Sequence, residues 1–390
     1  DTFHHTFFEM LGNWSFGDYY KKEAIEWAWD LLTKVWKLEK ERLWVTVYKD
    51  DDEAFDLWKS QTDISKDRIL RFGDKENFWE MGETGPCGPC SEIHYFIGDD
   101  ISLQSPEGVN RDDLYWELWN LVFIQNERLS DGTILNLPQS HVDTGAGLER
   151  ITTILQGKKS NYETDLFQPI IKQLEIFSGI KYNDNQVPFQ VIADHIRMLC
   201  FSIADGAIPS NEGRGYVLRR ILRRAARFGR MLKLEEPFLH KLVPIVSDLM
   251  SESYPELSDK DTHIELVIGT EETLFNQTLD RGINHFDKLL SDLKGNTISG
   301  SDAFRLYDTY GFPLDLTQLI AREKGIAVDE DGFDKEMAKQ KNKAREAGKF
   351  KIETKDVAWN NLLNGDQSKF IGYEFLESKS KVMKYAEIDA

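Results

Sequence analysis

The sequence predicts an α+β protein in which an antiparallel or mixed sheet flanked by helices is followed by a mostly helical region. Residues 6–151 interleave strand-like and helical patterns, and the residues after about Asn161 show mainly helical spacing of apolar side chains. A chain of 390 residues, 41% of them apolar, also exceeds what a single hydrophobic core supports. We therefore expect domains at residues 1–160, 161–355 and 356–390.

The first region is expected to hold a sheet with a helical cover. Its extended runs are residues 6–11, 43–48, 93–97 and 116–128. Residues 22–36 place Ile25, Trp29 and Leu32 on one helical face, so this helix should pack on the sheet. Residues 82–90 contain glycines and prolines that predict a loop.

The later regions are expected to be helical, apart from the end of the chain. Helical spacing covers residues 191–205, 215–233, 239–251, 261–293 and 301–324. Residues 330–355 are rich in Lys, Glu and Gln, which indicates a solvated helix or a linker. Residues 370–375 and 381–385 are typical of two short strands that begin a further domain.

The overall charge and the cysteines limit the functional classes. A net charge of −19 argues against binding nucleic acid with the whole surface but allows a local basic face. Three cysteines are too few for a disulfide framework and indicate a reducing, cytosolic setting. Cys87 and Cys90 have zinc-like spacing but no second pair, so we interpret them as structural. No apolar run approaches the ~18 residues of a membrane span, so we expect no membrane association.

Residues 143–150 are expected to form a strand-to-helix turn suited to a nucleotide. A strand should precede it, and a helix should run over residues 148–156 and close at Gly157. Gly147 lacks a side chain where a ligand could approach the backbone, and Arg150 can pair with phosphate or stack on a base. Such turns are also common as plain helix caps.

Residues 214–230 are expected to form a helix with a segregated basic face. This stretch carries no acidic residue, and its arginines are Arg214, Arg219, Arg220, Arg223, Arg224, Arg227 and Arg230. Helical spacing puts the arginines from 219 onward on one arc and apolar side chains on the other. Their density favours nucleic acid, and the alternative is pairing with carboxylates of a neighbouring domain. Just ahead of the helix, Asn211 is either a turn cap or a reader of a base edge.

Several long motifs occur in an order that is typical of one family. They are residues 4–18, 77–82, 119–123 and 143–150, the arginine helix, and residues 307–313. With these motifs the chain closely resembles alanyl-tRNA synthetases, which are class II aminoacyl-tRNA synthetases, along nearly all of its length. The resemblance implies a class II antiparallel sheet in the first region, a helical tRNA-recognition domain, and then a linker with the start of an editing domain.

The resemblance also implies a reaction. The family activates L-alanine with ATP to alanyl-adenylate and transfers the alanyl group to the 3′ end of tRNA(Ala), which it recognises by a G·U pair in the acceptor stem. Alanine's own carboxylate attacks the α-phosphorus, so no side-chain nucleophile is expected. The triphosphate implies Mg²⁺, for which Glu9 and Glu117 are candidate ligands. Zinc is expected only in the remainder of the editing domain.

The resemblance assigns site residues to positions of this sequence. The expected ATP contacts are His5, Phe7, Phe8, Trp79, Leu118, Trp119, Asn120, Gly147 and Arg150. Arg150 and one ring of the Phe7–Phe8 pair should enclose the adenine. The expected alanine contacts are Asn120, Asp143 and Trp79, with the Asp143 carboxylate as the complement of the ammonium group. The expected tRNA contacts are Asn211, Asp308, Arg214, Arg219, Arg220, Arg223 and Arg227.

Each of these roles has a structural alternative. Asp143 and Asn211 could be caps, the strand residues Leu118, Trp119 and Asn120 could point into a core, and His5 could be an ordinary buried residue. We expect the family's motif 1, and the half of motif 2 that supplies an arginine to the α-phosphate, to lie before Asp1.

Two other functional classes stay open. One is a non-catalytic tRNA-binding fragment or paralogue, and the other is an amino-acid-activating ligase that acts on a carrier protein. The second leaves the arginine helix and Asn211 without a role. We expect a cytoplasmic protein, and the sequence does not indicate an oligomeric state.

Overall fold

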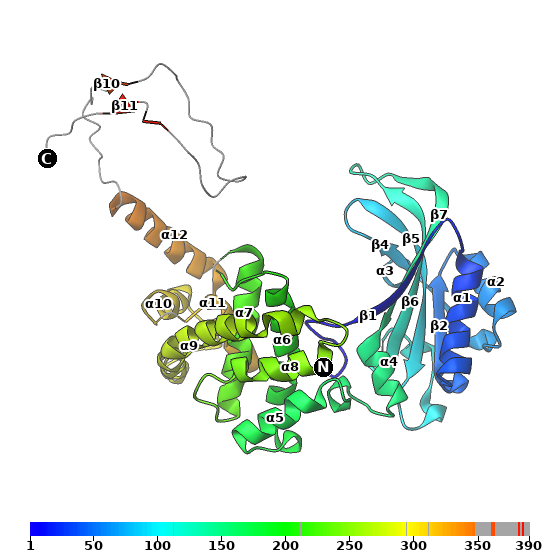
Figure 1. Ribbon diagram of the computed structural model, residues 1–390, viewed down its shortest axis with the longest axis horizontal. Helices are drawn as coiled ribbons and strands as arrows, with labels where there is room; N and C mark the ends of the chain where they lie inside the picture. The colour runs from blue at the N-terminus through cyan, green and yellow to red at the C-terminus, as the bar shows by residue number, and fades with distance from the viewer. Residues whose placement is uncertain are drawn as a thin grey trace. The chain divides into compact units, whose positions relative to one another are not determined.

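A computed structural model gives the fold of residues 1–111, 113–210, 212–293, 295–310, 312–347, 360–362, 381–382 and 384–385. The chain forms two compact units, Asp1–Ile283 and Asn284–Ala390. The first unit contains a sheet and a group of helices, and the second contains further helices and two small strand pairs (Figure 1). The expected α+β architecture, a mostly antiparallel sheet flanked by helices and followed by further helices, is therefore confirmed.

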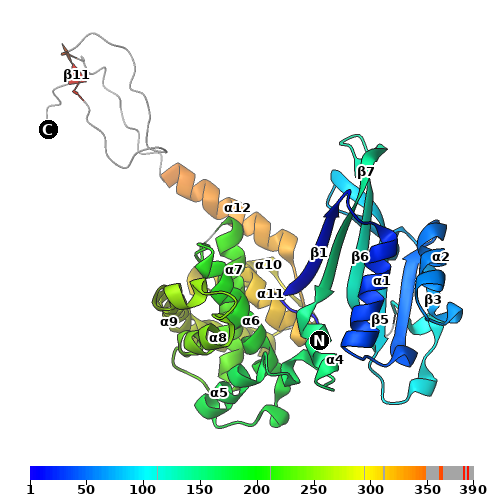
Figure 2. The same ribbon diagram turned by 45° about the vertical axis from the view of Figure 1, so that its right-hand side comes forward.

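The sheet of the first unit has seven strands. Six follow the order β1-β7-β6-β5-β2-β3, and the seventh, β4, pairs with β5. The strands are β1 Met10–Phe16, β2 Leu43–Tyr48, β3 Ile69–Phe72, β4 Phe78–Glu80, β5 Gly85–Phe96, β6 Tyr115–Arg128 and β7 Ile134–Gly147. All neighbours are antiparallel except β2 and β3. β1 lies at one edge of the sheet (Figure 2).

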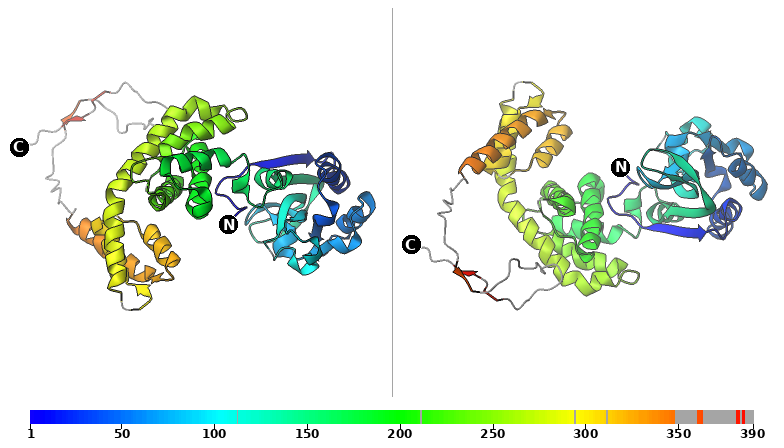
Figure 3. Two further views of the ribbon diagram at one scale, coloured as in Figure 1. Left: turned by 90° about the horizontal axis from the view of Figure 1, so that it is seen from below. Right: turned by 90° about the horizontal axis from the view of Figure 1, so that it is seen from above.

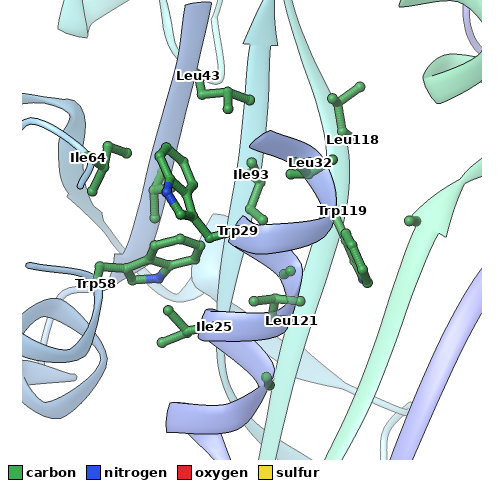
Figure 4. Close-up of a cluster of buried hydrophobic side chains, with 14 of the residues drawn as sticks. Ile25, Trp29, Leu32, Leu43, Trp58, Ile64, Ile93, Leu118, Trp119 and Leu121 are labelled. Atoms are coloured by element: carbon green, nitrogen blue, oxygen red, sulfur yellow. The ribbon is translucent and has the colours of Figure 1, made fainter. Parts of the chain in front are cut away.

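One face of the sheet is covered by α1 Lys21–Asp30, its continuation Leu31–Val35 and α2 Asp52–Gln61. The apolar face of α1 packs in one cluster with Ile93 of β5 and with Leu118, Trp119 and Leu121 of β6 (Figure 4). Trp58 of α2 is completely buried, and its indole N–H donates to Ser91 Oγ at 2.8 Å. The expected packing of this helix on the sheet is confirmed.

Two expectations about the strands were wrong. Residues 85–90 belong to β5 instead of a loop, because they pair with β4 and β6 and so satisfy their backbone groups. The ladder is irregular between Cys87 and Cys90, where Pro89 has no N–H to donate. The first strand runs over Met10–Phe16 instead of residues 6–11, because its register is set by pairing with β7.

The remaining helices of the first unit are α3 Asp74–Asn77, α4 Leu148–Leu155, α5 Gln168–Ser178, α6 Gln186–Ala204, α7 Gly213–Met231, α8 Val243–Met250 and most of α9 Glu256–Ser291. α4 ends at Leu155, and Gly157, two residues further on, adopts the left-handed conformation with φ 63° that commonly follows a helix. α6 packs among α5, α7 and α8, and α9 is one unbroken helix (yellow in Figure 3).

α6 is long and apolar enough to cross a membrane by length and composition, contrary to the expectation that no such stretch exists. Within the structure, 72% of this stretch is buried. A mostly apolar helix that other helices enclose has the composition of a core helix, and the charged side chains Asp194 and Arg197 of α6 are buried with partners. Its burial here is therefore explained by packing.

The second unit contains α10 Gly300–Tyr310, α11 Leu314–Glu323 and α12 Glu330–Ala347, with the strand pairs β8 Thr297–Ile298 with β9 Ala327–Val328, and β10 Asn360–Asn361 with β11 Lys384–Tyr385. The single helix expected over residues 301–324 is two helices, because Pro313 begins α11 and cannot continue α10. Of the two short strands expected near the end, residues 370–375 lie outside the described residues.

Two tryptophans of α1 make a direct test of this packing. Trp29 is 2% exposed and Trp27 is 53% exposed. We expect Trp29→Ala to lower the free energy of unfolding by roughly 3–5 kcal/mol, because it removes buried surface and leaves a cavity. Trp27→Ala, measured in the same urea denaturation, should cost less than about 1 kcal/mol. Similar losses for both variants would contradict the packing.

Candidate active site

A cavity of about 200 Å³, partly open to solvent, lies at the junction of β6, β7, α4 and the N-terminal segment. Its lining residues are Phe3, His4, His5, Phe8, Met10, Glu117, Leu118, Gly145, Gly147, Glu149, Arg150 and Asn161. Five residues that the sequence assigned to ATP are among them: His5, Phe8, Leu118, Gly147 and Arg150. Residues far apart in the sequence therefore meet at one concave site.

Arg150 is held in place by main-chain oxygen atoms. Its Nη1 donates to the Glu117 carbonyl at 2.7 Å and its Nε to the Phe3 carbonyl at 3.4 Å. The guanidinium carbon lies 5.4 Å from the centre of the Phe3 ring. Burial lowers the pKa of Arg150, but a guanidinium stays protonated in proteins. The cavity is therefore bordered by a fixed positive charge.

A carboxylate balances this charge. Glu117 Oε2 lies 3.9 Å from Arg150 Nη1. Burial and the neighbouring Glu92 raise the pKa of Glu117, while His94 and Arg150 act in the opposite direction. Glu92 Oε2 is in turn hydrogen-bonded to His94 Nε2 at 3.1 Å. A row of polar groups thus continues from the cavity along this face of the sheet.

A bulge brings the polar residues of β6 to the same face. The register between β5 and β6 shifts between Ile93 and His94, whose partners are Trp119 and Glu117, so Leu118 is the extra residue. Such an insertion reverses the alternation of side chains locally. Glu117 and Asn120 therefore share a face although three positions separate them.

The two phenylalanines assigned to the adenine differ in position. Phe8 is 50% exposed and lines the cavity. Phe7 stacks on Phe201 of α6, with ring centres 4.2 Å apart, and is not among the cavity residues. The geometry therefore favours Phe8 as the ring that accompanies Arg150.

His5 is enclosed by protein partners. The Asn161 amide donates to its Nε2 at 2.8 Å, and its Nδ1 pairs with Asp194 of α6 at 3.1 Å. Burial opposes ionisation of Asp194, but hydrogen bonds from His195, His5 and Thr6 keep the pKa of this carboxyl below its usual range. Both ring nitrogens of His5 are occupied, so it contributes to the cavity as a fixed part of the wall.

The residues assigned to alanine share the polar face of the sheet. Asn120 pairs with Gly145 of β7. Asp143, two residues before Gly145 on the same strand, pairs with Val122. The Asn120 Oδ1 atom is buried and has no hydrogen-bond partner among the described residues. Asp143 belongs to β7 instead of a turn, and its carboxylate forms no ion pair within the part of the chain that the structure describes. Asn120 and Asp143 are therefore diagonal neighbours on adjacent strands, and such residues are roughly 7–8 Å apart.

Other assigned residues lie away from this cavity. Trp119 is 8% exposed and packs in the core cluster beneath α1. Trp79 of β4 is half-buried, lies opposite Gly88 of β5, and is not a cavity residue. The core alternative, which the sequence left open for Trp119, therefore describes its position.

The two candidate magnesium ligands, Glu9 and Glu117, have different surroundings. Glu117 lines the cavity, whereas Glu9 accepts a hydrogen bond from Tyr254 at 3.1 Å and lies 3.6 Å from Arg197. Burial raises the pKa of Glu9. The described residues contain no group of three His, Cys, Asp or Glu side chains arranged for a metal ion. The three cysteines are buried and free.

Sequence reasoning missed part of the cavity wall. Phe3, His4, Met10 and Glu149 lie within or beside motifs already singled out, so their proximity to the site was a usable signal. Asn161, which follows α4, lines the cavity and donates to His5, and it belongs to none of those motifs. No local pattern marks such a residue.

The arginine helix α7 is partly tied to neighbouring helices. Arg219 and Arg223 both pair with Glu271 of α9, at 3.1 and 2.9 Å. Arg224 donates to His195 Nε2 at 2.7 Å. The carboxylate-pairing alternative therefore applies to part of the helix. Arg214 and Arg220 are exposed, and Arg227 is half-buried.

The structure describes only one of the two residues assigned to the G·U pair. Asn211 lies outside the described residues. Asp308 is an exposed residue of α10 in the second unit, and it accepts a hydrogen bond from the Gln340 side chain. Both assignments stay predictions.

Comparison with known proteins identifies the family of the chain. A family model described as tRNA synthetases class II (A) matches residues 1–389, so the chain belongs to that family. It is 55% identical over 387 residues to the alanine–tRNA ligase of Chlorobium chlorochromatii, covering 96% of this chain and 44% of the relative. The alanine–tRNA ligases of Chlorobaculum tepidum and Francisella philomiragia are 52% and 51% identical, covering 98% of this chain and 44% of each relative. The chain thus spans less than half the length of these curated relatives.

Proposed function

We propose that the chain is the aminoacylation and tRNA-recognition part of an alanine–tRNA ligase. Residues 1–160 would form the aminoacylation domain, residues 161–355 the tRNA-recognition domain, and residues 356–390 a linker and the start of an editing domain. The observation that carries the proposal is one cavity bordered by Phe8, Gly147 and Arg150, beside the polar face that holds Asn120 and Asp143. The protein would act in the cytoplasm.

ATP would bind in the cavity with its adenine between Phe8 and Arg150. A half-exposed aromatic ring and a fixed guanidinium both offer a flat surface to a base. Gly147, at the end of β7, has φ −73°, and a Cβ built there would contact only the Arg150 side chain, at 3.7 Å. The fold therefore leaves room for a Cβ at this position, and the bound nucleotide would be the reason for a glycine there.

L-Alanine would bind through its ammonium group. The Asp143 carboxylate supplies the opposite charge, and Asn120 Oδ1 is a buried acceptor that needs a donor. Gly145 lies opposite Asn120, and the Met10 side chain packs against it.

The reaction needs positioning more than side-chain chemistry. The alanine carboxylate oxygen would attack the α-phosphorus and release pyrophosphate, and the ribose hydroxyl of the terminal adenosine would then attack the carbonyl carbon and release AMP. Mg²⁺ would neutralise charge on the triphosphate, and Glu117, as the candidate ligand that lines the cavity, could contribute one oxygen. Arg150 would keep the nucleotide in place during both steps.

tRNA(Ala) would meet the exposed side of α7 through its phosphates, with Arg214 and Arg220 as the exposed cations. In A-form RNA the shallow groove is accessible, and a G·U wobble leaves the guanine 2-amino group there without its usual partner. The Asp308 carboxylate can accept from that amine, and the Asn211 amide can both donate and accept.

Exchange of pyrophosphate into ATP is the direct test. We expect protein expressed from its complete coding sequence to catalyse exchange that depends on alanine and to charge tRNA(Ala). A protein without any exchange would be the non-catalytic tRNA-binding alternative. Exchange without transfer to tRNA would indicate the ligase for a carrier protein.

Gly147→Ala tests the nucleotide position. We expect the KM for ATP to rise about tenfold or more, because the added methyl group enters space that the nucleotide needs. The midpoint of urea denaturation should not change. Gly73→Ala is the control, since a Cβ there meets no atom within 4 Å and φ is −87°. An unchanged KM for ATP in Gly147→Ala would contradict the assignment.

Asp308→Ala and Asn211→Ala test the tRNA contacts. We expect each to lower kcat/KM for charging tRNA(Ala) by roughly 5- to 150-fold, which corresponds to the ~1–3 kcal/mol of a good base contact, with pyrophosphate exchange unchanged. The control is a tRNA with G·C in place of G·U, which the variants should charge about as well as the wobble form. Equal loss in exchange and charging would contradict the assignment.

A further inference from the structure

Arg197 of α6 is a buried charge with a specific partner. Its side chain is 1% exposed, and its Nη2 lies 2.7 Å from Glu149 Oε1. The guanidinium carbon lies 4.5 Å from the centre of the Phe167 ring and 5.3 Å from that of Phe7. Its Nε and Nη1 atoms have no hydrogen-bond partner among the described residues. Glu149 is therefore the main group that compensates this charge.

Glu149 joins two segments that line the cavity. Both of its carboxylate oxygens accept from the Glu9 N–H at 3.1 Å. One residue earlier, the Leu148 N–H donates to the Glu9 carbonyl at 3.0 Å. The start of α4 is thus bound to the segment that leads into β1.

The neighbours of these anchor points are the proposed adenine contacts. Phe8 directly precedes Glu9, and Arg150 directly follows Glu149. The Glu149 carboxylate accepts from the Glu9 N–H and pairs with Arg197. Its position therefore affects the positions of the neighbouring residues Phe8 and Arg150. Arg197 itself is not a cavity residue, so it would act only through this placement.

We propose that Arg197 and Glu149 are a positioning pair that sets the placement of Phe8 relative to Arg150 for nucleotide binding. The inference rests on the proposed function. A guanidinium suits this role because its planar face fits between the two rings while one edge reaches the carboxylate. A lysine would keep the charge but lose the flat contact.

The test separates positioning from general stability. Arg197→Met, Arg197→Lys and Glu149→Gln are compared by pyrophosphate exchange, by the KM for ATP and for alanine, and by urea denaturation. We expect Arg197→Met and Glu149→Gln to raise the KM for ATP about 10- to 100-fold, as a shift near 1 Å at a binding group does, with less than about threefold change for alanine. Arg197→Lys should recover part of the loss.

Lys21→Met is the matched control. The Lys21–Asp51 pair is also buried, with both side chains 5% exposed and a separation of 2.7 Å, but it packs beside α2 and borders no cavity residue. We expect this variant to lose stability without a change in the KM for ATP. If Arg197→Met does not fold, the inference is tested by the KM of Arg197→Lys for ATP and for alanine.

Two results would overturn the inference: equal changes in the KM for ATP and alanine, or a rise in the control as large as in the Arg197 variants. The absence of exchange in the wild-type protein would instead overturn the proposed function.

Discussion

The register of β7 between β1 and β6 is the constraint on which the rest of the site depends. β7 is paired on both sides, so Gly147 stands opposite Met10 and Gly145 opposite Asn120. Because side chains alternate along a strand, a slip by one residue would turn Asp143 away from the polar face. The same strand leads directly into α4, so its register also determines where Arg150 emerges.

The two faces of the sheet differ in chemistry: one is apolar and the other carries polar side chains. The face beneath α1 is apolar and closely packed around Trp29 and Trp58, which supplies stability without involving the site. The other face carries Glu92, which is hydrogen-bonded to His94, and Glu117, which lies 3.9 Å from Arg150. A buried polar group is costly unless it has a partner, and the proposed alanine would supply a donor to Asn120 Oδ1, which has none among the described residues.

Much of the fold could be predicted from local pattern. The helix over Lys21–Asp30, the core strands and the arginine helix follow from periodic apolar residues, which bury one face wherever they fold. The Gly- and Pro-rich stretch at Gly85–Cys90 could not be predicted, because its strand state comes from pairing with β4 and β6 and not from propensity. The site was predicted in part: Phe8, Gly147 and Arg150 meet, whereas Trp119 packs in the core and Phe7 stacks on α6.

The sequence by itself determined the class of the chain, since ordered motifs carry the residue types that a nucleotide and an ammonium group require. It also determined which stretches are helical, because periodicity is a local property. Only the tertiary structure decided which of two adjacent phenylalanines borders the cavity, which arginines of α7 are paired with Glu271, and that Arg197 holds Glu149. These outcomes depend on contacts between residues distant in the chain, such as 149 and 197, and on a one-residue bulge that reverses side-chain direction, neither of which leaves a local signal.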